Sequence, residues 1–160
     1  MSDAAIKIRP ALADDLNVIV QFNEAMGLET EKKTLDDAVI REGVRRLLAD
    51  ERRGQYFIAE IDGMVVGQTM VTTEWSDWRS GYFWWIQSVY VSPEFRRRGI
   101  FRALHTQVRE AARRSGDVCG IRLYVHEANA RAMEAYQNLG MDRTHYAMFE
   151  EDWSHLETRD

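Results

Sequence analysis

In the first fifty residues, apolar positions recur with two different periods, that of a strand and that of a helix. Residues 5–10 alternate and stop at a proline, which predicts a first strand. Residues 14–25 and 34–50 carry apolar side chains at helical spacing, and the polar stretch between them, 27–33, is typical of a loop. The pattern therefore predicts one strand followed by two helices. For the second helix, Thr34 with the acidic residue three positions later predicts a capping box.

The middle of the chain has the alternation of a sheet. Residues 55–75 predict two strands joined at Asp62-Gly63, a dipeptide typical of tight hairpin turns. After a turn at 76–81, residues 82–93 are almost continuously apolar, as expected for a central strand covered on both faces.

The last third predicts a helix over 99–114, a buried strand over 118–125, a short helix over 129–140 and a closing strand over 141–153. In the short helix we expect Asn129 as the N-cap and Gly140 as the stop signal. The order of elements indicates a mixed α/β domain around one central sheet, and the length suits a single domain covering residues 1–160.

Composition narrows the class of protein. Twenty-one basic and twenty-six acidic residues give a net charge of −5, which argues against a nucleic-acid binder. No apolar run suits a signal peptide or a membrane span. The single cysteine, Cys119, fits a reducing compartment, so we expect a cytoplasmic protein with no membrane partner. The four histidines lack metal-binding spacing, and no metal is expected.

A run of three arginines leads into Gly99 where the 99–114 helix begins. A helix start presents unpaired backbone N–H groups and favours an anion, and a glycine lets a ligand approach the backbone. The stretch is therefore either a pyrophosphate seat or a solvated basic turn. Downstream, Asn129 and Tyr136 are seven positions apart and share one helix face. For an isolated pair, a helix cap and a core aromatic would be the better interpretation.

Together these features resemble the GCN5-related N-acetyltransferase (GNAT) superfamily along essentially the whole chain. Its coenzyme A motif, Gln/Arg-x-x-Gly-x-Gly/Ala, is matched at Arg96 and Gly99, whereas Phe101 replaces the usual small residue. The later motif Asn-x-x-Ala-x-x-x-Tyr-x-x-x-Gly is complete, at Asn129, Ala132, Tyr136 and Gly140.

The resemblance implies a mixed, mostly antiparallel sheet of six to seven strands, flanked by about four helices and splayed at a site for acetyl-CoA. It implies direct attack by an amine in a ternary complex, with Tyr136 as general acid toward the sulfur. The coenzyme A contacts that it implies are Val89, Tyr90, Val91, Arg96, Arg97, Arg98, Gly99, Ile100, Phe101, Arg102, Asn129, Ala132 and Tyr136.

Residues 74–100 are similar to the spermidine/spermine (diamine) acetyltransferase branch. That branch carries an acidic pair on the central strand, where this chain has Gln87 and Ser88. Polyamine specificity therefore does not carry over. The residues that we expect near an acceptor amine are Glu29, Glu31, Glu74, Trp75, Trp78 and Gln87. For a general base, Asp77, His126 and Glu127 are further candidates, and the tryptophans equally suit packing or an interface.

The leading hypothesis is an acetyl-CoA-dependent N-acetyltransferase for a primary amine of a small molecule. Analogy with the similar branch suggests a homodimer. The alternatives are a peptide or protein N-acetyltransferase, and a non-catalytic acyl-CoA-binding module.

Overall fold

The computed structural model describes residues 5–154 of the chain. These residues form two compact units, one ending at Tyr124 and the other beginning at Val125. The first unit contains a whole β-sheet and three α-helices, and the second contains a fourth α-helix. The single domain expected for residues 1–160 stays a prediction.

The sheet has five strands in the order β1-β2-β3-β4-β5. Its strands are β1 (Lys7–Pro10), β2 (Gln55–Ile61), β3 (Met64–Ser76), β4 (Gly81–Val91) and β5 (Val118–Arg122). The first four strands pair antiparallel, and β5 pairs parallel to β4. Since β4 has a neighbour on each side, the nearly continuous apolar run of residues 82–91 suits its central place.

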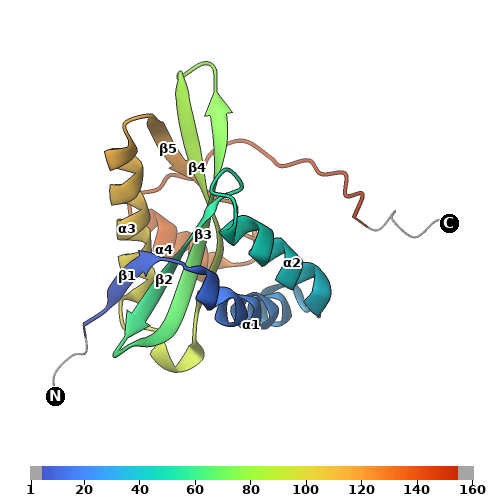
Figure 1. The fold of residues 1–160 in the computed structure, drawn as a ribbon. Coiled ribbons are helices and arrows are strands. Elements are labelled where there is room, and N and C mark those ends of the chain that lie inside the picture. The colour runs from blue at the N-terminus through green and yellow to red at the C-terminus, as the bar shows by residue number, and fades with distance from the viewer. Residues whose placement is uncertain (1–4, 155–160) are drawn as a thin grey trace. The chain divides into compact units, whose positions relative to one another are not determined.

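Helices cover both faces of this sheet (Figure 1). On one face lie α1 (Leu16–Met26) and α2 (Asp37–Leu48), and on the other lies α3 (Ile100–Ser115). The α3 face buries Ile100, Leu104 and Val108 against residues of the strands such as Phe57 and Ile86. The opposite face buries α1 and α2 against alternate residues of β2, because successive side chains of a strand point to opposite faces.

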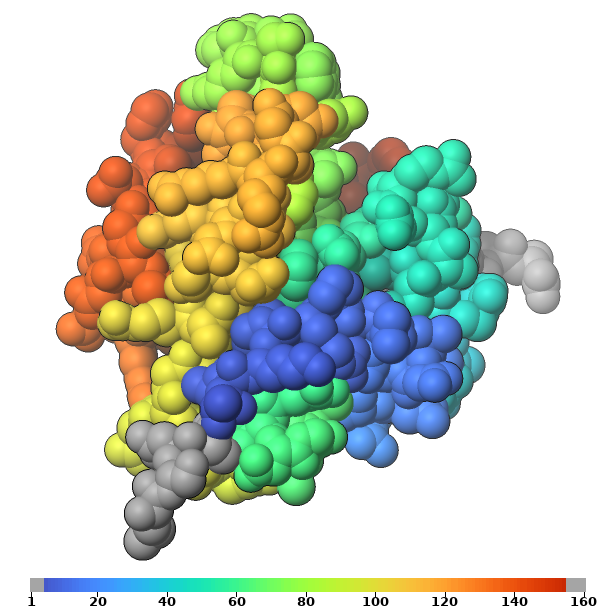
Figure 2. Space-filling view, turned by 60° about the vertical axis from the view of Figure 1, so that its left-hand side comes forward, coloured from blue at the N-terminus to red at the C-terminus, as the bar shows by residue number. Residues whose placement is uncertain are grey.

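The hairpin predicted at Asp62-Gly63 is confirmed. Both residues have positive φ, 51° and 76°, as a tight hairpin turn requires at its two central positions. The next hairpin, between β3 and β4, is much longer. Its light-green tip projects beyond the neighbouring α3–β5 region in Figure 2.

The expected count of six to seven strands is wrong, because the described residues form five. The predicted closing strand over 141–153 is not a strand, and its large apolar side chains stay exposed, with Phe149 at 95%. A strand needs a ladder partner and side-chain packing, and the local composition of 141–153 supplies neither. The strand predicted to run to residue 125 ends at Arg122.

Two helix boundaries also differ from the prediction. The expected loop at 27–33 begins with one turn of π-helix, Gly27–Glu31, which continues from α1 and ends at Lys32 in the left-handed region. The second helix begins at Asp37, and its N-cap is Asp36 instead of Thr34, since the Asp36 carboxylate accepts a hydrogen bond from the Val39 N–H at 3.0 Å. Asp36 lies two residues after Thr34 and is an equally favourable N-cap type, so it can take the capping role.

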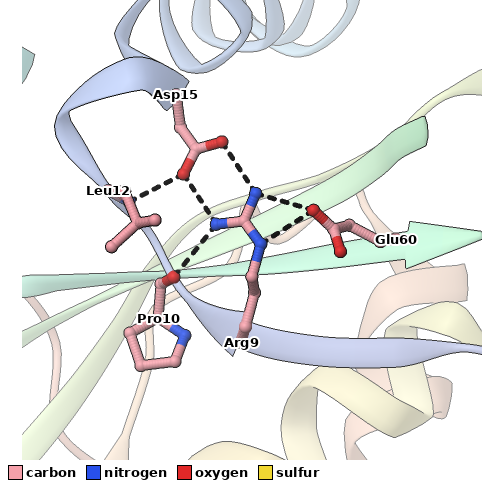
Figure 3. Close-up of polar contacts among 5 residues, drawn as sticks. All are labelled: Arg9, Pro10, Leu12, Asp15 and Glu60. Carbon is pink, nitrogen blue, oxygen red and sulfur yellow. Dashed lines mark hydrogen bonds and ion pairs between the residues drawn. The ribbon is translucent and has the colours of Figure 1, made fainter. Parts of the chain in front are cut away.

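Arg9 ties the first strand to the start of α1 and to β2 (Figure 3). Its guanidinium donates to both carboxylate oxygens of Asp15, at 2.7 and 2.9 Å, and to Glu60 at 2.7 Å. Asp15 also accepts from the Leu12 N–H at 2.7 Å, which closes the turn that precedes α1. The hydrogen bond from Arg9 is the main cause that lowers the pKa of the Asp15 carboxyl, against the opposing effect of burial.

We predict that Asp15→Asn lowers the free energy of unfolding at neutral pH by about 2 kcal/mol, because Arg9 loses a charged, mostly buried partner. A lowered folded-state pKa means that this contribution is present above the ordinary carboxyl pKa and is lost as pH falls through the folded value. Urea unfolding between pH 7 and pH 2 checks both statements. Asp37→Asn, which breaks the exposed pair with Arg41, is the control and should change stability little. If the wild type exceeds Asp15→Asn in free energy of unfolding by the same amount at every pH, the account is contradicted.

Candidate active site

The parallel pairing between β4 and β5 is short. It runs from Tyr82 opposite Val118 to Trp85 opposite Arg122, and β4 then continues to Val91 beside β3 alone. Backbone N–H and C=O groups require partners, and the β5 ladder does not supply them over 86–91. This stretch of β4 therefore offers a strand-like edge to a ligand that carries amide groups, as the expected splay requires.

A β-bulge interrupts β4 on this stretch. Gln68 stands opposite Tyr90 and Met70 opposite Gln87, so one residue of β3, Thr69, faces two residues of β4. Ser88, within the bulge, has a φ of 51°. A non-glycine residue in the left-handed region is uncommon and costs energy, so the surrounding contacts must hold it there.

Two successive carbonyls in the bulge face β3. The Gln87 carbonyl accepts from the Thr69 hydroxyl at 3.4 Å, and the Ser88 carbonyl accepts from the Gln68 side-chain amide at 3.3 Å. In a regular strand successive carbonyls point in opposite directions. In a trans peptide the N–H is antiparallel to the C=O, and the described chain has no cis peptide. The N–H groups of Ser88 and Val89 therefore both point away from β3, toward the edge that β5 has left.

The Ser88 side chain is also held from α1. The buried Asn23 amide donates to the Ile19 carbonyl at 3.0 Å and to the Tyr56 hydroxyl at 3.1 Å. Burial raises the pKa of Tyr56, while its hydrogen bonds with Asn23 and Ser88 act in the opposite direction. The Tyr56 phenol stays neutral at pH 7, so this polar chain braces the bulge without adding charge.

The Gln87 side chain is a neutral amide and cannot serve as a general base. Its amide donates to the Thr72 hydroxyl at 2.6 Å. Glu74 lies on β3 two residues beyond Thr72, and its carboxylate accepts a hydrogen bond from Arg122 at 2.8 Å. The Arg122 guanidinium also lies 3.5 Å from the centre of the Phe83 ring. The Glu74 carboxylate is therefore already paired with the Arg122 cation. Sequence reasoning missed Arg122, because nothing in its own neighbourhood marks it.

The turn after β4 has the geometry of an anion seat. Gly99 has a φ of 80° and directly precedes α3, whose first residues have no side-chain cap. A Cβ at Gly99 would have nothing within 4 Å, so its outer side is open. Arg97 also lies in the left-handed region, with a φ of 64°. The first N–H groups of a sixteen-residue helix, which have no carbonyl partner within the helix, thus lie beside exposed arginines.

Arg96 has a different set of partners from the rest of the turn. It donates to the Val91 carbonyl at 2.8 Å and to both oxygens of Glu29 at 2.8 and 3.0 Å, and it lies 5.5 Å from the centre of the Tyr90 ring. The structure thus pairs two residues that the sequence assigned to different ligands. Arg96 links the turn to the π-helical turn after α1, and the cation of Arg98 rests on the Phe95 ring at 5.1 Å.

The remaining acceptor candidates are spread over two places. Glu31 is exposed at the end of the π-helical turn. Trp75 is 54% exposed with its ring edge-on to Tyr82 at 4.9 Å, and Trp78 is 88% exposed at the tip of the long hairpin. Trp84 instead packs against the core on the α3 face, in line with the packing interpretation.

In the second unit, the motif that runs from Asn129 to Gly140 lies on α4 (Ala130–Asn138) and the residues that flank it. The Asn129 side chain accepts from the Ala132 N–H at 3.1 Å, which confirms it as the N-cap. Gly140 has a φ of 86°, as expected of a residue that ends a helix. Burial raises the pKa of the Tyr136 phenol, so it keeps its proton at neutral pH.

Comparison with known proteins identifies the family. The family profile described as "Acetyltransferase (GNAT) family" matches residues 21–141. The chain belongs to the GNAT acetyltransferase family. Its five-stranded mixed sheet and four α-helices are a GNAT fold, and the family generally uses acetyl-CoA. The closer resemblance to the spermidine/spermine branch is not confirmed.

Solved structures agree with this assignment. A protein described as a possible acetyltransferase from Clostridium difficile 630 is 45% identical, with a TM-score of 0.87 over 92% of this chain and 97% of that one. An aminoglycoside N-acetyltransferase, AAC(6')-Iy, solved in complex with CoA, is 18% identical with a TM-score of 0.78, over 93% of this chain and 95% of that one. The ribosomal-protein-alanine N-acetyltransferase of Brucella melitensis biovar Abortus 2308 is 17% identical with a TM-score of 0.75, over 92% and 99%. The last two show the fold alone. No curated protein matches the sequence.

Within residues 5–154, no helix has the length and apolar character needed to cross a bilayer. No group of three or more His, Cys, Asp or Glu side chains in that part of the chain is arranged to hold a metal ion.

Gly99 and Gly116 offer a matched test of the anion seat. Both flank α3, both have φ near 80°, and a Cβ would meet nothing within 4 Å at either. Alanine at each should therefore lower stability by a similar amount, about 1 kcal/mol. Only Gly99→Ala places a methyl group on the seat, and we expect it to weaken acetyl-CoA binding about tenfold, measured by calorimetry. Equal acetyl-CoA affinity in the two variants would show that the Gly99 turn does not bind the anion.

Proposed function

We propose that this protein transfers the acetyl group of acetyl-CoA to a primary amine of a small molecule, by direct attack in a ternary complex. The observation that carries the proposal is the bulge of β4, where two neighbouring N–H groups point to the edge left by β5. Such a pair of donors suits an oxygen on which negative charge develops.

The described backbone supports the cofactor contacts that we propose. The pantetheine arm pairs with the edge of β4 at Val89, Tyr90 and Val91, in place of the absent β5 ladder. The pyrophosphate lies at the start of α3, on the backbone N–H groups around Gly99. The remaining residues that we assign to coenzyme A are Arg97, Arg98, Ile100, Phe101, Arg102, Asn129, Ala132 and Tyr136. Arg96 joins them through the backbone, since its side chain is engaged with Glu29.

In the transfer step, the neutral amine nitrogen attacks the thioester carbon, and the N–H groups of Ser88 and Val89 stabilise the resulting oxyanion. The carbon–sulfur bond then breaks. Tyr136 donates its phenolic proton to the departing sulfur, and the new amide nitrogen loses its extra proton to water. Solvent returns a proton to Tyr136, so the protein is unchanged after one turnover.

Acceptor recognition rests on the π-helical turn after α1 and on the long β3–β4 hairpin near its tip. Glu31, Trp75 and Trp78 are exposed there and suit a cationic amine by charge and by cation–π contact. Gln87 cannot act as a base, and Glu29 and Glu74 already pair with arginines. In this proposal the amine loses its proton to water or before it binds, and Glu31, Asp77, His126 and Glu127 stay candidates for a base.

A thiol-release assay tests this proposal. Acetyl-CoA is mixed with the protein and a panel of small primary amines, with a lysine-containing peptide and a peptide with a free N-terminus as further acceptors. We expect free coenzyme A to appear with a small amine. Turnover with the peptides alone would replace the proposal with a peptide acetyltransferase. Tight acetyl-CoA binding without turnover would leave a binding module.

Tyr136→Phe tests the general acid. We expect kcat to fall by about a hundredfold with little change in acetyl-CoA affinity, because the sulfur loses its proton donor. Tyr146→Phe, which alters an exposed tyrosine of the same unit, is the control. Unchanged kcat in Tyr136→Phe would mean that another group or water protonates the sulfur.

The pH dependence of the wild-type rate also tests Tyr136 as the general acid. The rate should rise with pH as the amine loses its proton, and should not fall again below about pH 10, because burial holds the pKa of Tyr136 above its ordinary value. A decline in kcat that sets in near pH 8 would contradict this role.

A further inference from the structure

The bulge of β4 is gripped from both faces of the sheet by two successive residues of β3. Gln68 holds the Ser88 carbonyl and Thr69 holds the Gln87 carbonyl. Since successive side chains of a strand point to opposite faces, the two hydrogen bonds approach the bulge from opposite sides. Neither peptide plane can rotate toward a regular strand without losing one of them.

Both gripping side chains are buried, Gln68 at 0% and Thr69 at 2% exposure. The Gln68 amide is also incompletely satisfied, because its Oε1 is buried with no hydrogen-bond partner among the described residues. A buried acceptor without a partner lowers stability. An apolar side chain of the same length would avoid that cost, so stability alone does not explain an amide at this position. What the amide supplies is the Nε2 donor on the Ser88 carbonyl.

We propose that Gln68 and Thr69 are positioning residues for acetyl transfer. They orient the two peptide units whose N–H groups, on Ser88 and Val89, polarise the thioester carbonyl, and the inference rests on the function proposed above. They touch neither acetyl-CoA nor the acceptor. Their loss should therefore leave acetyl-CoA binding intact and slow the chemical step, because an oxyanion donor acts only where its geometry is correct.

Isosteric variants test the inference. Gln68→Met and Thr69→Val keep volume and remove the donor, and each should lower kcat by about tenfold to a hundredfold, with the acetyl-CoA dissociation constant changed less than about threefold. Thr69→Ser keeps the hydroxyl and should restore most of the rate. Thr73→Val makes the same change on β3 beside Trp84, away from the bulge, and is the matched control. Thermal unfolding checks that each variant is folded.

A spectroscopic readout separates positioning from general damage. Acetyl-CoA labelled with ¹³C at the carbonyl is bound to each variant without an amine, and the infrared carbonyl band is recorded. N–H donors that polarise the carbonyl lower its stretching frequency. We expect a clear downshift in the wild type, Thr69→Ser and Thr73→Val, and a smaller one in Gln68→Met and Thr69→Val.

The outcomes distinguish this inference from the proposed function. Wild-type turnover and downshift that persist unchanged in Gln68→Met and Thr69→Val would overturn the positioning role and leave the acetyltransferase proposal standing. A parallel loss of kcat and acetyl-CoA affinity with an unchanged band would assign both residues a structural role only. Failure of the proposed function would instead appear in the wild type, as absent turnover and an unshifted band. If Gln68→Met does not fold, the comparison of Thr69→Val with Thr69→Ser decides the matter.

Discussion

The end of the parallel ladder between β4 and β5 is the constraint on which the rest of the structure depends. Backbone polar groups in a sheet must be paired, and after Trp85 the β5 ladder no longer pairs those of β4. A sheet can keep such an edge at its centre only where a ligand or water takes the place of a strand. The edge is also where the bulge lies, so the same few residues present both a strand-like surface and two N–H donors that point away from β3.

The elements around this edge hold it in shape. Asn23 and Tyr56 brace Ser88 from the α1 side, and Gln68 and Thr69 hold the neighbouring carbonyls from β3. The Arg96–Glu29 pair joins the turn before α3 to the π-helical turn after α1. Both partners are about 40% exposed, so the pair adds little stability. Its value is geometric, because it keeps the proposed cofactor turn beside a segment that we propose as part of the acceptor site.

The sequence predicts the elements whose signals are local. The β2–β3 hairpin at Asp62-Gly63, the central strand and the Asn129 cap each depend on a few adjacent residues, and each is confirmed. The Gly99 turn is likewise marked by its own residues, whereas the roles of Gly99 and Tyr136 stay predictions. Features that depend on distant partners were missed. No glycine marks the bulge at Ser88, nothing near Arg96 indicates that its side chain binds Glu29, and the apolar residues after Gly140 do not reveal that no strand forms there.

The most direct test of the account is a crystal structure of the protein with acetyl-CoA bound. We predict that the pantetheine arm lies along the free edge of β4, that the pyrophosphate lies at the start of α3, and that the thioester oxygen is within hydrogen-bond distance, about 3 Å, of the N–H groups of Ser88 or Val89. A thioester oxygen that points to solvent or to a side chain, with the two N–H groups bonded elsewhere, would contradict the central claim.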